Sequence, residues 1–278
     1  MEDYTSYIEQ SSNILSIVCH RGLWGPAPEN SIAAVERAIK NGFPIVEIDV
    51  RQDLNGEFYL IHDASFDRTT NLSGPIKHCS VKDIRRPLLF AGDGNSKQIT
   101  DQKLPSLFEV LETFKKQIFF DIDVKNREER IDLIKFVNQN KFANYVDVKK
   151  PILSIGDALS FRNGEEENDI IKMVVLEPNN ISLDEIISIL KITKPKIVEI
   201  NYNSFATFES LSRFAKQMGI SVWVNTIDDV ASCGLTDSLA MRYPDKCWGY
   251  LKSHGANIIQ TDKPLELKDW LKKNSHKL

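Results

Sequence analysis

A short stretch of the chain, from His20 to His62, concentrates side chains that suit proton transfer and the binding of charged groups. It holds two histidines, an arginine and two carboxylates that are spaced two residues apart: His20, Arg21, Glu47, Asp49 and His62. Each of these side chains is costly to bury without a partner. We therefore expect a functional site here rather than part of an apolar core.

The carboxylates of this stretch predict a metal site. Side chains two residues apart on a strand share one face, so Glu47 and Asp49 lie together, and Asp123 belongs to a similar alternation later in the chain. Three carboxylates make an oxygen-rich site that suits a hard divalent cation, Mg²⁺ or Ca²⁺, with waters completing its shell. The alternative is a structural network in which these acids pair with Lys125 and Arg21, although buried ion pairs stabilise proteins poorly.

The basic side chains predict acid–base and phosphate chemistry. His20 and His62 can transfer protons near neutral pH. Arg21 suits bidentate binding of a phosphate, and Lys125 adds a point charge. A single histidine is more often structural, but a pair beside a metal and a phosphate-binding arginine favours acid–base roles.

The elements that must position these residues alternate between short β-branched runs and longer amphipathic runs. Expected strands are residues 15–19, 45–50, 58–61, 118–124, 151–155, 172–176, 196–200, 220–224 and 257–260. Expected helices are residues 31–41, 106–115, 183–190, 205–218, 238–254 and 265–273. These make about eight β/α units, which predicts an α/β protein with the TIM (β/α)8 barrel fold. An open doubly wound sheet is the main rival, but no glycine-rich phosphate loop follows the first strand.

A barrel has its active site at the C-terminal ends of its strands, and the predicted chemical residues follow or end several of the expected strands. Asn55-Gly56 is a hairpin signal between two of them. Residues 64–103 are polar and rich in turn residues, so we expect an insertion after the second β unit that lies over one end of the fold. We predict a single domain over residues 1–278.

The composition excludes several classes of function. The chain has 278 residues, 42% hydrophobic and 27% charged, and a formal net charge of −4, which disfavours nucleic acid and anionic membranes as partners. The N-terminus is acidic, and no apolar run reaches the roughly 20 residues that span a bilayer. The four cysteines are scattered. We expect a cytoplasmic protein without stable membrane association that binds a small polar substrate, and the oligomeric state stays open.

Several motifs together resemble the glycerophosphodiester phosphodiesterase family. The first set is His20-Arg21-Gly22, Pro28-Glu29-Asn30-Ser31, Glu47-x-Asp49, His62-Asp63 and Arg68-Thr69-Thr70. The later set is Asp123-x-Lys125, Trp223-x-Asn225-Thr226 and the run from Gly255 to Pro264. The order and spacing are similar over almost the whole chain, including the insertion after His62-Asp63.

The resemblance implies a metal-dependent phosphodiesterase that hydrolyses glycerophosphodiesters to glycerol phosphate and an alcohol. It implies Glu47, Asp49 and Asp123 as metal ligands and His20 and His62 as the general acid–base pair. It further implies phosphate binding by Arg21 and Lys125, with Trp223 as a pocket wall. In the family mechanism a neighbouring substrate hydroxyl attacks phosphorus, and water then opens the cyclic phosphate.

The sequence departs from the family pattern at two of these positions. Asp123 stands where glutamate is more common, and Gln260 stands where a small or apolar residue is usual, so it could point into the pocket. Glu177 could bind a substrate hydroxyl or serve a surface role, and Asn225 could add a sugar contact. These departures leave open a phosphodiester-forming synthase or transferase similar to the agrocinopine synthases. A non-catalytic binding module and a phospholipase D-like toxin action are weaker alternatives.

Overall fold

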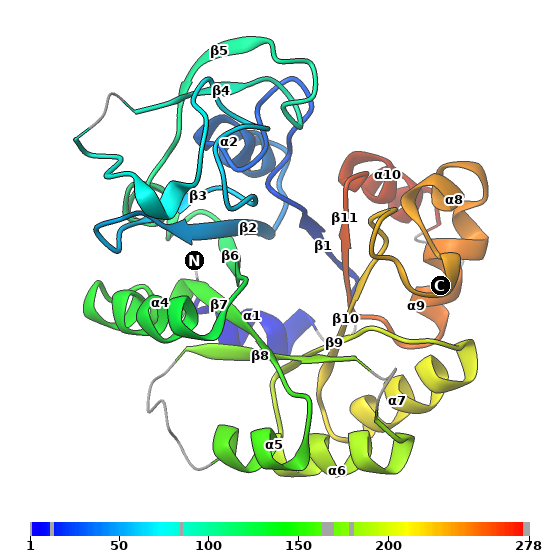
Figure 1. Ribbon diagram of the computed structural model, residues 1–278. Coiled ribbons are helices and arrows are strands. Elements are labelled where there is room, and N and C mark those ends of the chain that lie inside the picture. The colour runs from blue at the N-terminus through cyan, green and yellow to red at the C-terminus, as the bar shows by residue number, and fades with distance from the viewer. Residues whose placement is uncertain (1, 12–13, 84–85, 163–169, 178–180, 275–278) are drawn as a thin grey trace. The chain divides into compact units, whose positions relative to one another are not determined.

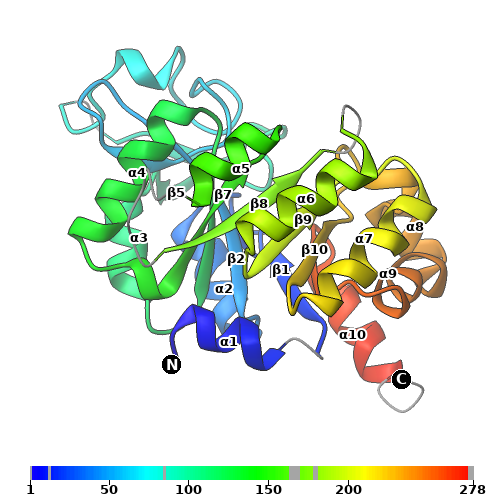
Figure 2. The same ribbon diagram turned by 90° about the horizontal axis from the view of Figure 1, so that it is seen from below.

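The computed structural model describes residues 2–11, 14–83, 86–162, 170–177 and 181–274 (Figures 1 and 2). The chain divides into two compact units. The first is Cys19–Val148, and the second combines Glu2–Val18 with Lys149–Leu278. Two strands, β1 (Ser16–Cys19) and β7 (Val146–Pro151), extend across the unit boundaries. Each unit is described by itself below.

The first unit holds the predicted acid–base and metal-binding residues. Its elements are α2 (Ile32–Lys40), β2 (Ile45–Gln52), β3 (Phe58–Leu60), the 3-10 helix η2 (Ile76–His78), β4 (Leu88–Phe90), β5 (Ile99–Lys103), α3 (Leu107–Phe114), β6 (Phe119–Val124), α4 (Arg127–Gln139) and the 3-10 helix η3 (Ala143–Tyr145). Ser31 caps α2, because its hydroxyl accepts a hydrogen bond from the Ala34 amide (3.0 Å).

The pairing of β2 with β6 brings two pairs of carboxylates into register. The two strands are parallel, with Glu47 opposite Asp121 and Asp49 opposite Asp123. Both strands are almost wholly buried, which explains their runs of isoleucine, valine and phenylalanine. The period of two in each strand then places all four carboxylates on the same face of the sheet.

The chain after β2 returns through the predicted hairpin. Strand β3 is antiparallel to β2, and Gly56 in the turn has a φ of +78°, a conformation that glycine adopts without strain. The predicted insertion, residues 64–103, carries the antiparallel pair β4–β5. An apolar cluster joins the insertion to the chain on either side of it, and its members are Phe66, Ile76, Val81 and Leu89 of the insertion with Tyr59, Ile61 and Leu104 outside it.

The second unit is built from parallel strands and their helices. Its elements are α1 (Tyr4–Gln10), α5 (Ile155–Arg162), β8 (Ile171–Leu176), α6 (Leu183–Thr193), β9 (Ile197–Ile200), α7 (Phe205–Gln217), β10 (Ser221–Asn225), the 3-10 helix η5 (Ser232–Gly234), α8 (Asp237–Arg242), the π-helix η6 (Asp245–Gly249), α9 (Tyr250–Ser253), β11 (Ile258–Thr261) and α10 (Pro264–Asn274). Figures 1 and 2 show α5, α6 and α7 following one another along these strands.

The strand order confirms the predicted fold class. Along the sheet it is β1-β11-β10-β9-β8-β7-β6-β2-β3, with helices between successive parallel strands. In the second unit, β8–β9, β9–β10 and β10–β11 are all parallel. This is the topology of a TIM (β/α)8 barrel. Within the described residues, no helix combines the length and the apolar character that crossing a membrane requires.

Two predicted elements were wrong in position or continuity. The strand expected at residues 151–155 is β7, Val146–Pro151, and Ile155 already begins α5. The charged residues of β7 interrupt its apolar pattern, so the period of two was missed. The single helix expected at residues 238–254 is three helical segments, because Pro244 follows the end of α8 and cannot donate the backbone hydrogen bond that continues a helix.

Candidate active site

The site begins with a strained turn directly after β1. Arg21 has a φ of +55° and Asn30 a φ of +51°, conformations that non-glycine residues rarely adopt. The Arg21 amide donates to Oε2 of Glu47 (3.0 Å), and the Asn30 amide donates to the Arg21 carbonyl (3.0 Å). These bonds hold both residues in place. Such strain is typical of functional sites.

Three carboxylates meet as predicted for a metal site. Glu47, Asp49 and Asp123 each offer a ligand oxygen, and these oxygens lie within 4.8 Å of one another. Glu47 and Asp49 are buried, and Asp123 is partly exposed. The Asn30 side chain fixes Asp49 from two sides, since its Nδ2 donates to Oδ2 (3.0 Å) and its Oδ1 accepts from the Asp49 amide (3.0 Å).

Cations surround the central carboxylate. Arg21 Nε lies 3.2 Å from Oδ2 of Asp49, and Lys125 Nζ lies 3.1 Å from Oδ1. Burial alone would raise the pKa of Asp49, but the charges of Lys125 and Arg21 outweigh it and hold that pKa well below its usual range. Lys125 also donates to Asp123 (2.6 Å). The ion pairs that the alternative interpretation predicted are therefore present alongside the cluster of carboxylates.

The charge balance of this cluster favours a divalent cation. The carboxylates linked by these contacts are Glu29, Glu47, Asp49, Asp63 and Asp123, and the permanent cations are Arg21, Arg68 and Lys125. Among these residues the carboxylates outnumber the permanent cations, and an excess of negative charge suits a bound divalent cation. The all-oxygen donor set is the one that Mg²⁺ and Ca²⁺ prefer. The residues present fit the implied metal.

A chain of hydrogen bonds orients His62. The Asp63 carboxylate accepts from Nδ1 of His62 (2.7 Å), which assigns the proton to Nδ1 and leaves Nε2 for chemistry. Arg68 donates two bonds to Asp63 (2.8 and 3.0 Å) and a third to Glu29 (2.7 Å). Glu29 is buried and also accepts from Arg21 Nη1 (3.0 Å). A continuous network therefore connects His62 to Arg21.

The pKa of Asp63 follows from this network. Partial burial opposes ionisation, but the hydrogen bonds from Arg68 and His62 lower the pKa to about 2. The pKa of Arg68 is raised, because Asp63 and Glu29 outweigh the effect of burial. Asp63 is thus a fixed negative charge at any pH near neutral. This charge favours a proton on His62 Nδ1.

The two predicted catalytic histidines are both accessible. The His62 side chain is 34% exposed and that of His20 is 12% exposed, whereas the side chain of Glu47 is 2% exposed. His20 Nε2 lies 3.9 Å from Oε2 of Glu47. The geometry thus combines buried, oriented carboxylates with imidazoles that can reach a ligand.

Two of the predicted substrate residues of the second unit, Trp223 and Gln260, belong to one polar cluster. The Trp223 indole is fully buried, and its Nε1 donates to Oε1 of Gln260 (3.2 Å). Two residues that sequence reasoning did not select join them: Lys149 donates to Gln260 (3.2 Å) and pairs with Glu199 (3.1 Å). Their only sequence signal was a charge at an inward-facing strand position. For Lys149 this signal was missed, because the strand was predicted at residues 151–155.

Glu177 and three motif residues, Glu29, Asn30 and Arg68, remain to be placed. Glu177 is exposed just after β8 and makes no hydrogen bond or ion pair with any described residue. Glu29, Asn30 and Arg68 were recognised as motif residues, but their contacts with Asp49, Asp63 and Arg21 were not predicted. These contacts join residues far apart in sequence, and no local pattern encodes them.

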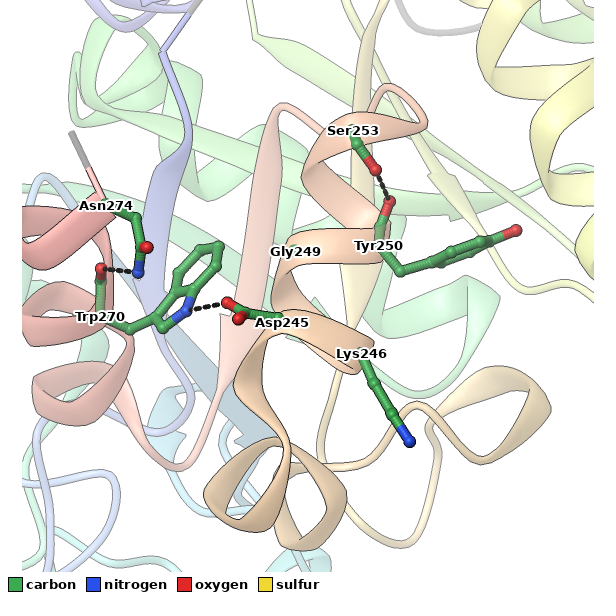
Figure 3. Close-up of a pocket in the computed structure, with 7 residues that line it drawn as sticks. All are labelled: Asp245, Lys246, Gly249, Tyr250, Ser253, Trp270 and Asn274. Carbon is green, nitrogen blue, oxygen red and sulfur yellow. Dashed lines mark hydrogen bonds between the residues drawn. The ribbon is translucent and has the colours of Figure 1, made fainter. Parts of the chain in front are cut away.

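A surface pocket of the second unit lies among other residues. It has a volume of about 550 Å³ and is lined by Asp245, Lys246, Gly249, Tyr250, Ser253, Trp270 and Asn274 (Figure 3). Asp245 accepts a hydrogen bond from Trp270 Nε1 (2.8 Å), which ties η6 to α10. None of the predicted site residues lines this pocket. The predicted site residues therefore lie outside this pocket.

Comparison with known proteins gives partial sequence matches. A family model described as a domain of unknown function matches residues 172–271, which all belong to the second unit. A glycerophosphodiester phosphodiesterase of Caldanaerobacter subterraneus subsp. tengcongensis is 33% identical over 161 residues, 50% of this chain and 65% of that protein. The Homo sapiens glycerophosphodiester phosphodiesterase 1 is 34% identical over 111 residues, 39% of this chain and 34% of that protein. In both cases the match covers less than two thirds of the relative's own length.

Solved structures share the fold over nearly the whole chain. The crystal structure of a glycerophosphoryl diester phosphodiesterase from Parabacteroides distasonis has a TM-score of 0.77 at 16% identity and covers 98% of this chain and 93% of that chain. A phosphodiesterase of Oleispira antarctica, in complex with the product sn-glycerol-3-phosphate, has a TM-score of 0.67 at 20% identity and covers 94% and 99%. These likenesses show the barrel fold.

Proposed function

We propose that this chain, which its relatives assign to the glycerophosphodiester phosphodiesterase family, is a phosphoric diester hydrolase that acts on glycerophosphodiesters. The observation that carries this proposal is the convergence of Glu47, Asp49 and Asp123 beside two accessible histidines. Metal-dependent phosphodiester cleavage uses a metal-binding set of carboxylates together with an acid–base pair. The Oleispira antarctica neighbour, in complex with sn-glycerol-3-phosphate, supports a small-molecule substrate.

The two histidines divide the proton transfers between them. In the mechanism that the family implies, a hydroxyl of the glycerol moiety attacks phosphorus, and one histidine accepts its proton. The other histidine protonates the oxygen of the leaving alcohol as the P–O bond breaks. Water then opens the cyclic phosphate with the roles reversed. The hydrogen bond from His62 Nδ1 to Asp63 supports this role, because it holds the ring with Nε2 available.

A divalent ion, Mg²⁺ or Ca²⁺, would be held by Glu47, Asp49 and Asp123. When bound, it supplies positive charge that stabilises the phosphoryl oxygens as negative charge develops. Arg21 and Lys125 contribute their own positive charges to the phosphate. Both are already held beside Asp49 by ion pairs, so they need little reorganisation when the substrate binds.

We propose recognition roles for the other predicted substrate residues, Trp223, Gln260 and Glu177. Trp223 and Gln260 form a connected polar pair, which supports a recognition role. Glu177, exposed after β8, is available to bind a hydroxyl. The free thiols of Cys79, Cys233 and Cys247 support a reducing compartment, and we assign the protein to the cytoplasm on that basis.

Release of glycerol phosphate from glycerophosphodiesters tests this function. We expect the purified protein to release it from sn-glycero-3-phosphocholine or a similar ester in a coupled dehydrogenase assay. We expect EDTA to abolish turnover and excess Mg²⁺ or Ca²⁺ to restore it. No metal-dependent turnover on a panel of such diesters would reject the proposal.

A further inference from the structure

Five side chains of the second unit form a closed polar network at the C-terminal ends of four strands. They are Lys149 on β7, Glu199 on β9, Trp223 and Asn225 on β10, and Gln260 on β11. Lys149 contacts Glu199 (3.1 Å) and Gln260 (3.2 Å). Asn225 Nδ2 donates to the other oxygen of Glu199 (3.0 Å). Trp223 Nε1 donates to Gln260 (3.2 Å) and lies 3.3 Å from Oδ1 of Asn225.

This network is costly as a purely structural device. Glu199 and Gln260 are 5% and 3% exposed, and the Lys149 side chain is 11% exposed. Inward-facing strand positions of TIM barrels are usually filled by branched aliphatic residues. A buried ion pair at such a position rarely stabilises a fold more than apolar residues of similar size. A binding role accounts for the polar residues at these positions.

The orientation of Gln260 shows what the network can still bind. Its Oε1 faces two donors, Lys149 Nζ and Trp223 Nε1, so the amide cannot be flipped without losing both bonds. Its Nε2 donates to no other described residue. Two N–H groups of a nearly buried amide thus have unused hydrogen-bonding capacity. A ligand that supplies an oxygen acceptor there would satisfy them.

The charges of the network select among the possible ligands. Lys149 pairs with Glu199, so a carboxylate of the network already offsets the charge of its ammonium group. Lys149 Nζ also lies 5.6 Å from the centroid of the Trp223 ring, in the position that a ligand cation would otherwise take. Lys149 therefore repels a quaternary ammonium such as choline from the face of the Trp223 ring. A hydroxyl suits this site, because it can accept from Gln260 and donate to Glu199.

We propose that Lys149, Glu199, Asn225 and Gln260 form a binding site for the hydroxyl groups of an uncharged polyol or sugar, which is the alcohol moiety of the diester substrate. Lys149 and Glu199 are then specificity-determining residues in addition to the predicted Trp223 and Gln260. The assignment of this ligand as the alcohol moiety rests on the proposed hydrolase function.

A pair of substrates that differ only in the alcohol tests the proposal. We expect the ratio of kcat/KM for sn-glycero-3-phospho-myo-inositol to that for sn-glycero-3-phosphocholine to be about ten or more in the wild-type protein, because one or two hydrogen bonds distinguish the esters. A ratio of one or less in an active enzyme would overturn the inference and leave the hydrolase function standing.

The variant Gln260→Glu isolates the proposed contact. It keeps an oxygen towards Lys149 and Trp223, removes both N–H donors and adds a negative charge. We expect the substrate ratio to fall by about tenfold or more towards the choline ester. Should this variant fold poorly, Gln260→Met removes the same donors without adding charge. A ratio that stays at the wild-type value in a folded variant would contradict a recognition role.

Neighbouring lysines provide a matched control. Lys149→Met should lower the ratio, whereas Lys150→Met should not, since successive strand residues face opposite sides of the sheet and Lys150 Nζ lies 5.4 Å from the centroid of the Phe161 ring. Calorimetric titration with myo-inositol and with choline chloride tests the site without turnover. Inositol binding that Gln260→Glu abolishes would support the site even if no diester is hydrolysed. Equal binding of choline, or no inositol binding by any form, would overturn it.

Discussion

The polar cluster of the first unit and that of the second unit differ in what their side chains have left to bind. In the first unit, the carboxylates of the described contacts outnumber the permanent cations despite their many ion pairs. In the second unit, Lys149 pairs with Glu199, and the amide donors of Gln260 have no acceptor among the described residues.

This difference indicates two tasks. An excess of buried negative charge is stable only if a cation compensates it, which suits a centre that binds a metal and a charged phosphoryl group. A cluster whose side chains orient one another and keep unused donors instead discriminates between ligands by the hydrogen bonds that each ligand can complete. We therefore expect the residues of the first unit to carry out the chemistry and those of the second unit to recognise the substrate. The following predictions test that division.

Removal of either histidine should have the largest effect. We expect His20→Ala and His62→Ala each to lower kcat by roughly 10² to 10⁴, because a positioned acid or base contributes about that much. Steady-state kinetics with circular dichroism as a check on folding would measure this. His78→Ala, an exposed histidine on η2, is the matched control and should retain full activity. Wild-type rates in either site variant would remove that histidine from the mechanism.

Loss of the central carboxylate should abolish metal binding. Asp49→Asn removes one of the three clustered ligand oxygens, and we expect Mg²⁺ or Ca²⁺ affinity to fall more than about a hundredfold, because even residues that only orient ligands cost up to that much. Calorimetric titration of the protein with each ion measures the affinity. Asp132→Asn, at an exposed position of α4, serves as the control. If Asp49→Asn binds the ion normally, the carboxylates form only a structural network.

Arg68 should have a smaller effect, through His62. Arg68→Lys keeps the charge but cannot donate to Asp63 and Glu29 at once in the same geometry. We expect kcat to fall about tenfold with little change in KM, because the substrate is bound but His62 is poorly oriented. An altered pH profile of kcat should accompany the loss. A change confined to KM would instead make Arg68 a substrate-binding residue.

The two units should also respond oppositely to pH in their stability. Burial raises the pKa of Asp237 in the second unit to about 6, although Thr226, Thr261 and the Asp262 amide donate to it. A raised folded-state pKa favours the protonated form, so this stabilisation is present below pH 4 and is lost as the pH rises to about 6. The difference from the unfolded value corresponds to about 3 kcal/mol.

Urea unfolding of the wild type and of Asp237→Asn between pH 4 and 6 measures this term. In the wild type, ionisation of Asp237 makes the free energy of unfolding fall as the pH rises from 4 to 6. The variant should lack this fall. Asp63 in the first unit has the opposite sign, because its lowered pKa stabilises the fold above pH 4 and this stabilisation is lost as the pH falls towards 2. Identical slopes in the two proteins would show that Asp237 does not titrate in this range.

The sequence predicted the first unit better than the second for a physical reason. His20, Glu47, Asp49 and His62 stand in short motifs at the ends of apolar strands, and the period of two alone places Glu47 and Asp49 on one face. The fold class followed from the same alternation of strands and helices. The strained backbone at Arg21 and the contacts of Glu29 with two arginines depend on residues distant in sequence, which periodicity does not report.

The second unit was harder because its polar residues come singly. Lys149, Glu199 and Gln260 lie on three separate strands, and only the tertiary structure brings them together. The charges on β7 also disguised the strand itself, so residues 151–155 were assigned instead. Recognition residues of this kind emerge from tertiary structure rather than from motifs.

One comparison tests the division between chemistry and recognition most directly. It measures kcat/KM for sn-glycero-3-phospho-myo-inositol and sn-glycero-3-phosphocholine in the variants His62→Gln and Glu199→Gln. We predict that His62→Gln lowers both values by the same large factor, so their ratio is unchanged, whereas Glu199→Gln shifts the ratio towards the choline ester. Equal losses on both substrates in Glu199→Gln, or a shifted ratio in His62→Gln, would contradict the account.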